Sequence, residues 1–434
     1  MKTHSIAAGR VGIGAALKWL FVLPGCSGLF FGIATPAQNR ESLAGEKAAR
    51  ALQESAQDEA GRYNIHYGPL GFQIGAGVRF GYTDNLFYSE TNRVSDFLIN
   101  PEVNLGAFLQ VSELNTLKLS LRMGYEYYLK NTALNGNAPL VNPDTELDFN
   151  VFAGDFHIRL HERFSYQESL FNNTSASGQN LLFNFNNVGT FSRINNVAGV
   201  NVDWDLNKLI LSVGYDHENF DSLTESFKYL NRVSELFTAS ASLLIGDHAK
   251  IGLESKGGLH DFKTETTLND HWQARFGPFV DVNLMEKVNL RAGGGYDLAR
   301  YDAAGAGSDY STYYAYGRVS QETRLFTHSL SVGRENLLGG NANNLEDTYV
   351  RYSITSPAIQ HWDVGANAAY HSDREYGAAF SEDFTYYVVG VKAGYQIHKN
   401  WRTEVGYEYV LKNSELALRN YDRNRVTFSL AFTF

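Results

Sequence analysis

The chain has 434 residues and a formal net charge of −10, and charged residues make up 19% of it, below the roughly 25% typical of soluble domains. The high aromatic content of 14% excludes a disordered chain, and the lack of a basic excess argues against a nucleic-acid binder. The single cysteine, Cys26, excludes a disulfide scaffold. No apolar run of about 18 residues follows residue 40, which excludes a bundle of transmembrane helices.

The N-terminus has the features of a targeting segment. A basic start is followed by an apolar stretch over residues 11–34, which predicts a secretory signal peptide over residues 1–37 with cleavage after Ala37. A second interpretation stays open, because the residues before Cys26 resemble a lipoprotein cleavage box and would place a lipid on that cysteine. Residues 38–68 are expected to form a periplasmic leader, either a short polar helix or a frayed segment.

From residue 69 onward apolar residues recur at every second position. Between Leu70 and Tyr82, for example, apolar or small side chains alternate with Gly, Gln and Arg. A period of two places the two sets on opposite faces of a β-strand. We find 18 such segments, which begin near residues 69, 95, 115, 145, 156, 194, 209, 232, 249, 271, 288, 311, 324, 346, 361, 383, 401 and 421.

The connections between these segments alternate in length, with eight short and nine long. That alternation is expected of an up-and-down antiparallel barrel whose two chain ends lie on the short-turn side. Side chains cannot fill a barrel of this size, so the apolar face must meet lipid and the polar face a wet lumen. The sequence therefore predicts an all-β transmembrane barrel over residues 69–434, in the bacterial outer membrane. The long connections are expected near 84–94, 130–144, 168–193, 220–231, 261–270, 301–310, 335–345, 372–382 and 412–420.

Aromatic residues recur on the lipid side near the strand ends, as in the interfacial girdles of membrane barrels. Tyrosines mark the long-connection end and Trp or Phe the short-turn end. The predicted girdle residues are Tyr82, Tyr125, Tyr127, Tyr166, Tyr215, Tyr296, Tyr370, Tyr407, Tyr409, Trp204, Trp362, Trp401 and Phe434.

Short motifs resemble known outer-membrane proteins. Residues 421–434, which end in Phe434, look like the last strand of such proteins, and this resemblance implies recognition by the barrel-assembly machinery. Residues 82–87, 95–96, 100–101, 327–330 and 333–335 resemble the β-barrel porin-2 family. The resemblance spans about residues 69–434. It implies a barrel without catalytic residues and a link with exopolysaccharide export.

The polar face of the strands carries 15 acidic and 14 basic residues, so the lumen is expected to be nearly neutral. This balance is compatible with neutral hydrophilic cargo, or with charges that pair and only keep the wall wet and rigid. The candidate pore-lining residues are Arg79, Glu102, Arg122, Glu126, Arg159, Arg163, Asp216, Glu254, Lys256, Arg275, Asp281, Arg291, Asp297, Arg318, Arg351, Lys392, Arg402, Glu404, Glu408 and Arg425.

Aromatic residues also interrupt the polar face. They could stack on the rings of a sliding glycan, or pack beneath a loop that folds inward. We expect the longest connection, 168–193, to fold inward and narrow the pore, because it holds Phe171, Leu181 and Phe183. The candidate sugar-stacking residues are Phe108, Phe279, Tyr314, Tyr316, Tyr349 and Tyr386.

The sequence predicts no catalytic, cofactor or metal site. His157 and His161 share one strand face but lie about 13 Å apart, too far to hold one ion. Asp203 and Asp205 resemble the start of a calcium loop, but no suitable Glu follows, so we interpret them as part of a turn.

The leading hypothesis is a passive conduit that exports a secreted polysaccharide. The alternatives are a general diffusion porin for small solutes and a structural or adhesive barrel closed by its loops. The expected partners are outer-membrane lipid, the barrel-assembly machinery and a periplasmic polysaccharide-export component, with no nucleic acid and no cofactor.

Overall fold

The structure is a computed structural model that describes residues 63–168, 191–246, 248–264, 267–302, 307–359, 361–377 and 380–434. The predicted signal peptide, most of the predicted leader and most of the connection 168–193 lie outside the described residues. The described chain forms 20 strands and two short 3₁₀-helices. No helix within it is long and apolar enough to cross a membrane.

The elements follow one another in a simple alternation of strand and connection. Their bounds are β1 Ile65–Tyr67, β2 Leu70–Thr83, β3 Asp96–Gln110, β4 Thr116–Gly124, β5 Tyr127–Tyr128, η1 Thr132–Leu134, β6 Leu140–Ala153, β7 Phe156–Gln167, β8 Arg193–Asp205, β9 Leu209–Ser222, η2 Glu225–Leu230, β10 Arg232–Ile245, β11 Ala249–Phe262, β12 His271–Met285, β13 Val288–Tyr301, β14 Tyr310–Glu322, β15 Thr327–Leu338, β16 Asn344–Ile359, β17 Trp362–Gly377, β18 Phe380–His398, β19 Trp401–Ser414 and β20 Tyr421–Thr433.

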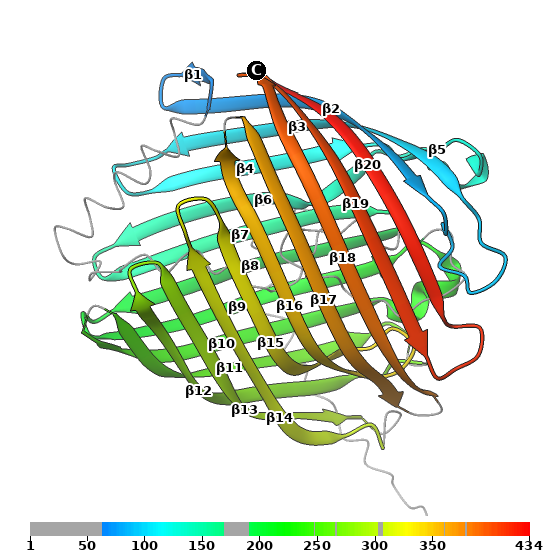
Figure 1. The fold of residues 1–434 in the computed structure, drawn as a ribbon. Coiled ribbons are helices and arrows are strands. Elements are labelled where there is room, and N and C mark those ends of the chain that lie inside the picture. Colours follow the sequence, from blue (N-terminus) through cyan, green and yellow to red (C-terminus); the bar gives the residue numbers. More distant parts are fainter. Residues whose placement is uncertain are drawn as a thin grey trace, which may run out of the picture.

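These strands form one closed antiparallel barrel (Figure 1). Each wall strand pairs with the next in the sequence, and β5 continues the wall position of β4 because both pair with β3. The last strand, β20, pairs with β2 from Gly75↔Thr433 to Thr83↔Arg425 and closes the wall. The predicted 18-stranded up-and-down barrel is confirmed.

The two faces of the wall differ as the alternation predicts. On β18, Tyr387, Val389 and Val391 are exposed on the outer face, while Tyr386 and Val388, at the alternate positions, are buried. Exposed apolar side chains recur in this way on strands all around the barrel. The outer surface is therefore an apolar band, and the inner face is polar.

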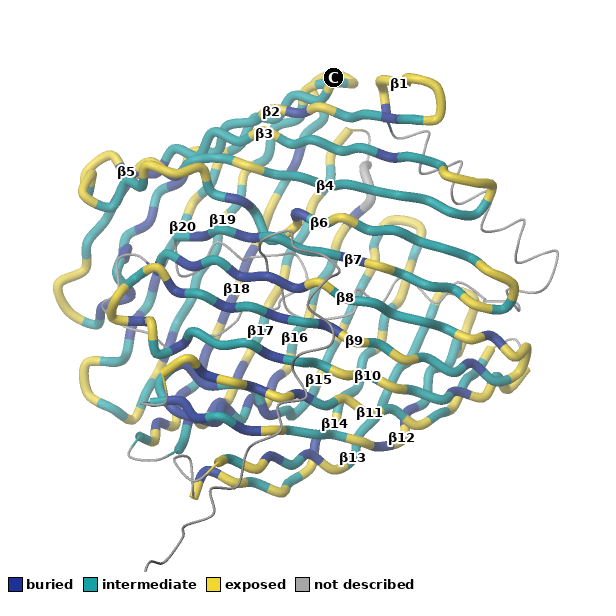
Figure 2. The backbone as a smooth tube through the Cα atoms, turned by 180° about the vertical axis from the view of Figure 1, so that it is seen from behind, coloured by how far each residue is buried: buried dark blue, intermediate teal, exposed yellow. Residues whose placement is uncertain are grey.

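Buried residues gather toward the end of the barrel with the long connections (Figure 2). Transmembrane barrels carry short turns on the periplasmic side and longer loops outside, so we name this end the outer mouth. Both the start of β2 and the C-terminus at Phe434 lie at the opposite end (Figure 1).

One predicted long connection is in fact a hairpin. Residues 372–382 were expected to form a loop, but β17 and β18 stay paired up to Gly377↔Phe380. This extension carries polar residues on both faces, such as Arg374 and the adjacent Glu375. Hydropathy therefore no longer alternates along it, although the hydrogen bonds between the two strands continue.

Two further boundaries differ from the sequence-based expectation. The strand predicted to run from near residue 115 to the connection at 130 is interrupted after Gly124. There Tyr125 donates its backbone N–H to the carbonyl oxygen of Pro101 instead of continuing the regular ladder. The short strand β1 lies in the segment predicted as leader and pairs with β2.

Candidate pore and its outer mouth

The inner face carries ion pairs that run from strand to strand. Glu146 on β6 accepts hydrogen bonds from Arg159 at 2.9 Å and Arg163 at 3.1 Å, both on β7. Asp148 accepts a second bond from Arg159 at 2.8 Å. Arg159 and Arg163 were predicted to line the pore, and the structure brings them together with these two acids as one compensated network.

A second network spans the five strands from β11 to β15. Arg291 lies 3.2 Å from Glu254, which also accepts a hydrogen bond from Tyr316 at 3.0 Å. Arg275 lies 3.5 Å from Asp297 and 3.4 Å from Glu335.

The other predicted pore-lining residues follow the same rule. Most of them have a charged or polar partner on the inner face. This favours the interpretation that the lumen charges pair with one another along the wall. The role of these residues in lining a pore stays a prediction. The pairs are Arg79 with Glu102, Arg122 with Asp144, Glu126 with Asn100, Asp216 with His161, Asp281 with Lys250, Arg318 with Ser329, Arg351 with Asp347, Arg402 with Asp363 and Glu404, and Glu408 with Arg423, while Lys256, Lys392 and Arg425 lie on β11, β18 and β20.

The predicted sugar-stacking rings are covered by neighbouring side chains. The guanidinium of Arg291 lies 4.9 Å from the ring centre of Phe279, and that of Arg351 lies 3.9 Å from that of Tyr349. Tyr63 stacks on Phe108 with ring centres 5.6 Å apart. Tyr314 and Tyr316 stack on one another, and Tyr386 is 1% exposed. This arrangement is that of packed wall residues, and the sugar-stacking role stays a prediction.

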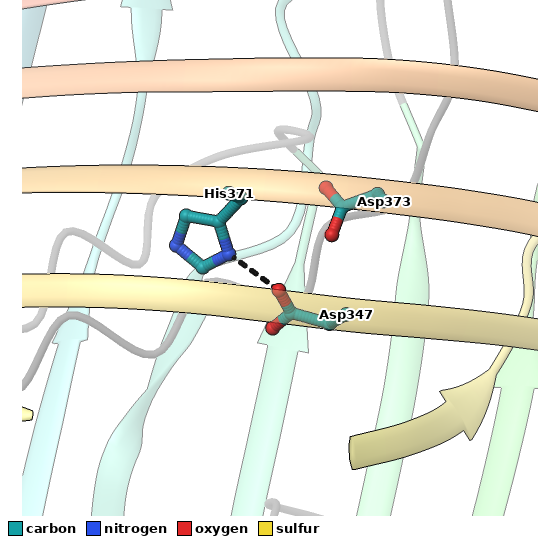
Figure 3. Close-up of side chains that lie close together, drawn as sticks. All are labelled: Asp347, His371 and Asp373. Carbon is teal, nitrogen blue, oxygen red and sulfur yellow. Dashed lines mark hydrogen bonds and ion pairs between the residues drawn. The ribbon is translucent and has the colours of Figure 1, made fainter. Parts of the chain in front are cut away.

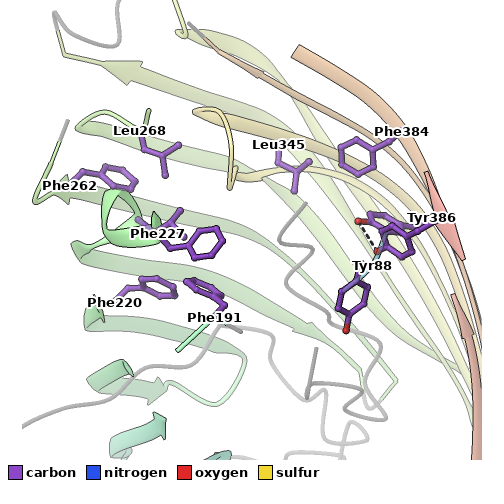
Figure 4. Close-up of a cluster of buried hydrophobic side chains, with 11 residues drawn as sticks. Tyr88, Phe191, Phe220, Phe227, Phe262, Leu268, Leu345, Phe384 and Tyr386 are labelled. Carbon is purple, nitrogen blue, oxygen red and sulfur yellow. Dashed lines mark hydrogen bonds between the residues drawn. The ribbon is translucent and has the colours of Figure 1, made fainter. Parts of the chain in front are cut away.

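A cluster of buried apolar side chains lies at the outer mouth (Figure 4). We call it the mouth cluster. Its residues come from strand ends and connections around the barrel, so it links walls that are far apart in the sequence. The members are Tyr88, Phe191, Phe220, Phe227, Leu230, Phe262, Leu268, Leu345, Phe384, Tyr386 and Tyr421.

Ring contacts connect the members of the mouth cluster. Phe191, next to β8, packs against Phe227 of η2 with ring centres 4.8 Å apart. On the other side Tyr88 packs edge-on against Tyr421 of β20 at 5.4 Å. Burial raises the pKa of Tyr88 to about 12, because the ionised phenolate would lose its contact with water there. The cluster therefore narrows the mouth with apolar side chains.

The connection 339–343 between β15 and β16 joins the loops of the mouth, and we call it the hub loop. The carboxylate of Glu375, on β17, accepts hydrogen bonds from the backbone N–H groups of Gly340 at 2.6 Å, Asn341 and Ala342 at 3.2 Å. Glu375 is completely buried. One side chain thus fixes three consecutive residues of the hub loop.

The hub loop also contacts the other connections of the mouth. Asn343 exchanges hydrogen bonds with Asn269, between β11 and β12, and donates to Ser308, between β13 and β14, at 2.8 Å. Tyr229 of η2 donates to the carbonyl oxygen of Gly340 at 2.9 Å. The constriction predicted for the connection 168–193 lies outside the described residues. Within them, the hub loop reaches from the β15–β16 connection to η2 on another part of the wall.

Sequence reasoning missed the charged residues at the mouth. Glu375, Glu382 and Lys412 are completely buried, and Lys412 donates to Glu382 at 2.8 Å. The first two lie in the segment taken for a loop. Their even spacing with Asp373 and Phe384 on paired strands is the signal that could have revealed them.

The predicted girdle residues lie on the outer face of the strands. Tyr82, Tyr125, Tyr166 and Tyr409 are half-buried there, while the others are exposed, with Tyr296 at 63% and Trp362 at 51%. An apolar outer band around a closed antiparallel barrel is the surface that a bilayer requires, since closure satisfies every backbone polar group. The chain is a barrel of the bacterial outer membrane.

The chain is similar to several solved outer-membrane proteins, with low sequence identity and TM-scores below 0.5. The outer membrane protein OpdK from Pseudomonas aeruginosa is 13% identical with a TM-score of 0.46, covering 84% of this chain and 99% of that one. OccK2 (OpdF) from the same species, solved with glucuronate, is 10% identical with a TM-score of 0.48 over 84% and 98% of the chains. A BenF-like porin from Pseudomonas fluorescens is 11% identical with a TM-score of 0.48 over 84% and 99%. No family model and no curated protein matches the chain.

Proposed function

We propose that this protein is a porin, a passive conduit for small hydrophilic solutes across the outer membrane. The observation that carries the proposal is the closed 18-stranded wall with a polar inner face, because barrels of 16–18 strands enclose an aqueous channel. The mouth cluster and the hub loop narrow its outer end, and this geometry favours small solutes over long chains.

Export of a secreted polysaccharide is the second candidate. It is supported by the resemblance of the short motifs to the β-barrel porin-2 family and by the aromatic rings along the inner face. For that cargo the mouth cluster would have to open, and the rings now covered by Arg291 and Arg351 would have to become accessible.

Single-channel recording of the refolded barrel in a planar bilayer tests the two candidates. We expect a steady open current that long neutral oligosaccharides leave unchanged and short sugars reduce, because only the latter enter the pore. Transient blockade by the long oligosaccharides would favour the export of glycans. A complete absence of current would contradict both and favour a structural barrel.

We expect the open pore to have weak ion selectivity. The inner-face charges are nearly balanced and compensate one another, as in the network of Glu146 with Arg159 and Arg163, so we expect no ring of one sign along the described part of the wall. The reversal potential in a KCl gradient should therefore lie close to zero. A value close to that of an ideal cation or anion electrode would contradict the paired-wall interpretation.

A further inference from the structure

Three buried side chains with metal-binding groups meet on the inner face near the outer mouth (Figure 3). Asp347 on β16 lies directly opposite Asp373 on β17 in the strand register. His371 precedes Asp373 by two residues, so it lies on the same face of β17. One nitrogen or oxygen of each lies within 4.8 Å of the others, and no other such group of three occurs in the part of the chain that the structure describes.

The two carboxylates differ in how their charge is compensated. Asp347 accepts a hydrogen bond from His371 Nδ1 at 2.9 Å and another from Arg351 at 3.2 Å. Asp373 is only 4% exposed, and among the described residues no N–H or hydroxyl group donates to its oxygens. Its one hydrogen-bond partner is the carboxyl of Asp347, a contact that needs a proton between the two acids. The nearby cation Lys412 donates to Glu382 at 2.8 Å.

With both carboxyls ionised, this arrangement is unfavourable without a further positive charge; a proton shared between them is the alternative. Two carboxylates directly opposite one another on neighbouring strands repel, and a buried carboxylate is costly unless it is paired or coordinates a metal. Figure 3 shows the carboxylate of Asp373 turned toward Asp347 and the imidazole, so the unsatisfied oxygens point into the group. The lack of an N–H or hydroxyl donor to the buried Asp373 is thus an observation independent of the clustering itself.

We propose that Asp347, His371 and Asp373 bind a divalent transition-metal ion of the Zn²⁺ class. One imidazole nitrogen with two carboxylate oxygens is a donor set that suits Zn²⁺ and its neighbours, whereas Ca²⁺ and Mg²⁺ prefer oxygen alone. The remaining position would hold water or an anionic group of a solute in the lumen. The proposal does not depend on which cargo passes.

Binding requires a change in the imidazole. His371 Nδ1 faces Asp347, while its Nε2 lies 3.3 Å from Nε of Arg351. When the metal bonds to Nδ1, the ring proton resides on Nε2, so the ring stays neutral and the contact with Arg351 is lost. Arg351 is therefore a competitor of the ion, and its removal should strengthen binding.

Calorimetric titration of the metal-free, untagged barrel in detergent with Zn²⁺ tests the proposal. We expect one ion per barrel for the unaltered chain and a loss of affinity of at least about 100-fold in Asp373→Asn, which preserves the shape of the side chain. Arg351→Gln is expected to bind more tightly. Co²⁺ serves as a spectroscopic probe, because its visible absorption should change on binding to the unaltered chain and not to Asp373→Asn.

A matched control is His157→Gln, which alters another inner-face histidine, 3.5 Å from Asp203, that belongs to no group of three ligands among the described residues. It should bind Zn²⁺ like the unaltered chain. Circular dichroism and heat-modified gel mobility establish that each variant forms the barrel. No binding by the unaltered chain would overturn the proposal and leave a proton shared between the two carboxyls, and equal binding by Asp373→Asn would also overturn it.

Discussion

Replacing Glu375 by alanine is expected to widen the outer mouth and raise the single-channel current. This carboxylate accepts three consecutive backbone N–H groups of the hub loop. Each buried donor that loses its acceptor costs about 1–3 kcal/mol, so the loop loses most of what fixes it to β17. The loop in turn holds Asn269, Ser308 and Tyr229, so its release should loosen the connections around the mouth as well.

A second variant tests the same loop without changing a charge. A Cβ atom on Gly339 would lie 2.1 Å from the carbonyl oxygen of Ala342, so Gly339→Ala forces the hub loop out of its conformation. The matched control is Glu113→Gln, which removes one exposed carboxylate at a short turn on the opposite end. Larger or noisier currents are expected in Glu375→Ala and Gly339→Ala but not in the control. Unchanged currents in both would show that the hub loop does not constrict the pore.

Replacing Glu382 by glutamine is expected to destabilise the barrel by about 3–5 kcal/mol, the usual cost of removing one partner of a buried ion pair. The carboxylate oxygens of Glu382 lie 2.8 Å from Nζ of Lys412 and 2.9 Å from the guanidinium of Arg419. Both Glu382 and Lys412 are completely buried. Without the carboxylate, the ammonium of Lys412 remains buried with its main partner gone.

Equilibrium urea unfolding followed by tryptophan fluorescence measures this effect. The double variant Glu382→Gln with Lys412→Met should recover much of the lost stability, because it removes both charges of the pair. Glu225→Gln removes one partner of an exposed pair with Lys228 and should leave the unfolding midpoint unchanged. If the single variant at Glu382 is as stable as the unaltered chain, the pair is not buried as described.

The sequence predicts the wall of this barrel well and its outer mouth poorly. Within the bilayer each strand has lipid on one side and water on the other, so hydropathy alternates along it. The strands that contain Leu70 and Val426 can therefore be located from this alternation alone. Past the apolar band both faces are polar, and the paired extension with Glu375 and Glu382 resembles a loop.

The hub loop is a second part of the outer mouth that the sequence does not predict. Length and apolar content directed attention to the connection 168–193, whereas the hub loop has five residues and only one of them, Ala342, is apolar. Its role arises from hydrogen bonds to residues distant in the sequence, such as Asn269 and Glu375, and no local pattern records these partners. For the same reason, nothing in the sequence indicates that Asp347, His371 and Asp373 lie together, since they come from two strands.

The seam between β2 and β20 also bears on how the protein is made. Its nine residue pairs join the first and last wall strands of the chain, so the N-terminal part cannot complete its hydrogen bonding until translation has ended. An unclosed sheet has two open edges that hydrocarbon does not tolerate. A nonsense codon anywhere before residue 421 should therefore not produce a smaller pore. The truncated chain should fail to assemble and be degraded by periplasmic proteases, so such alleles should behave like a deletion of the gene.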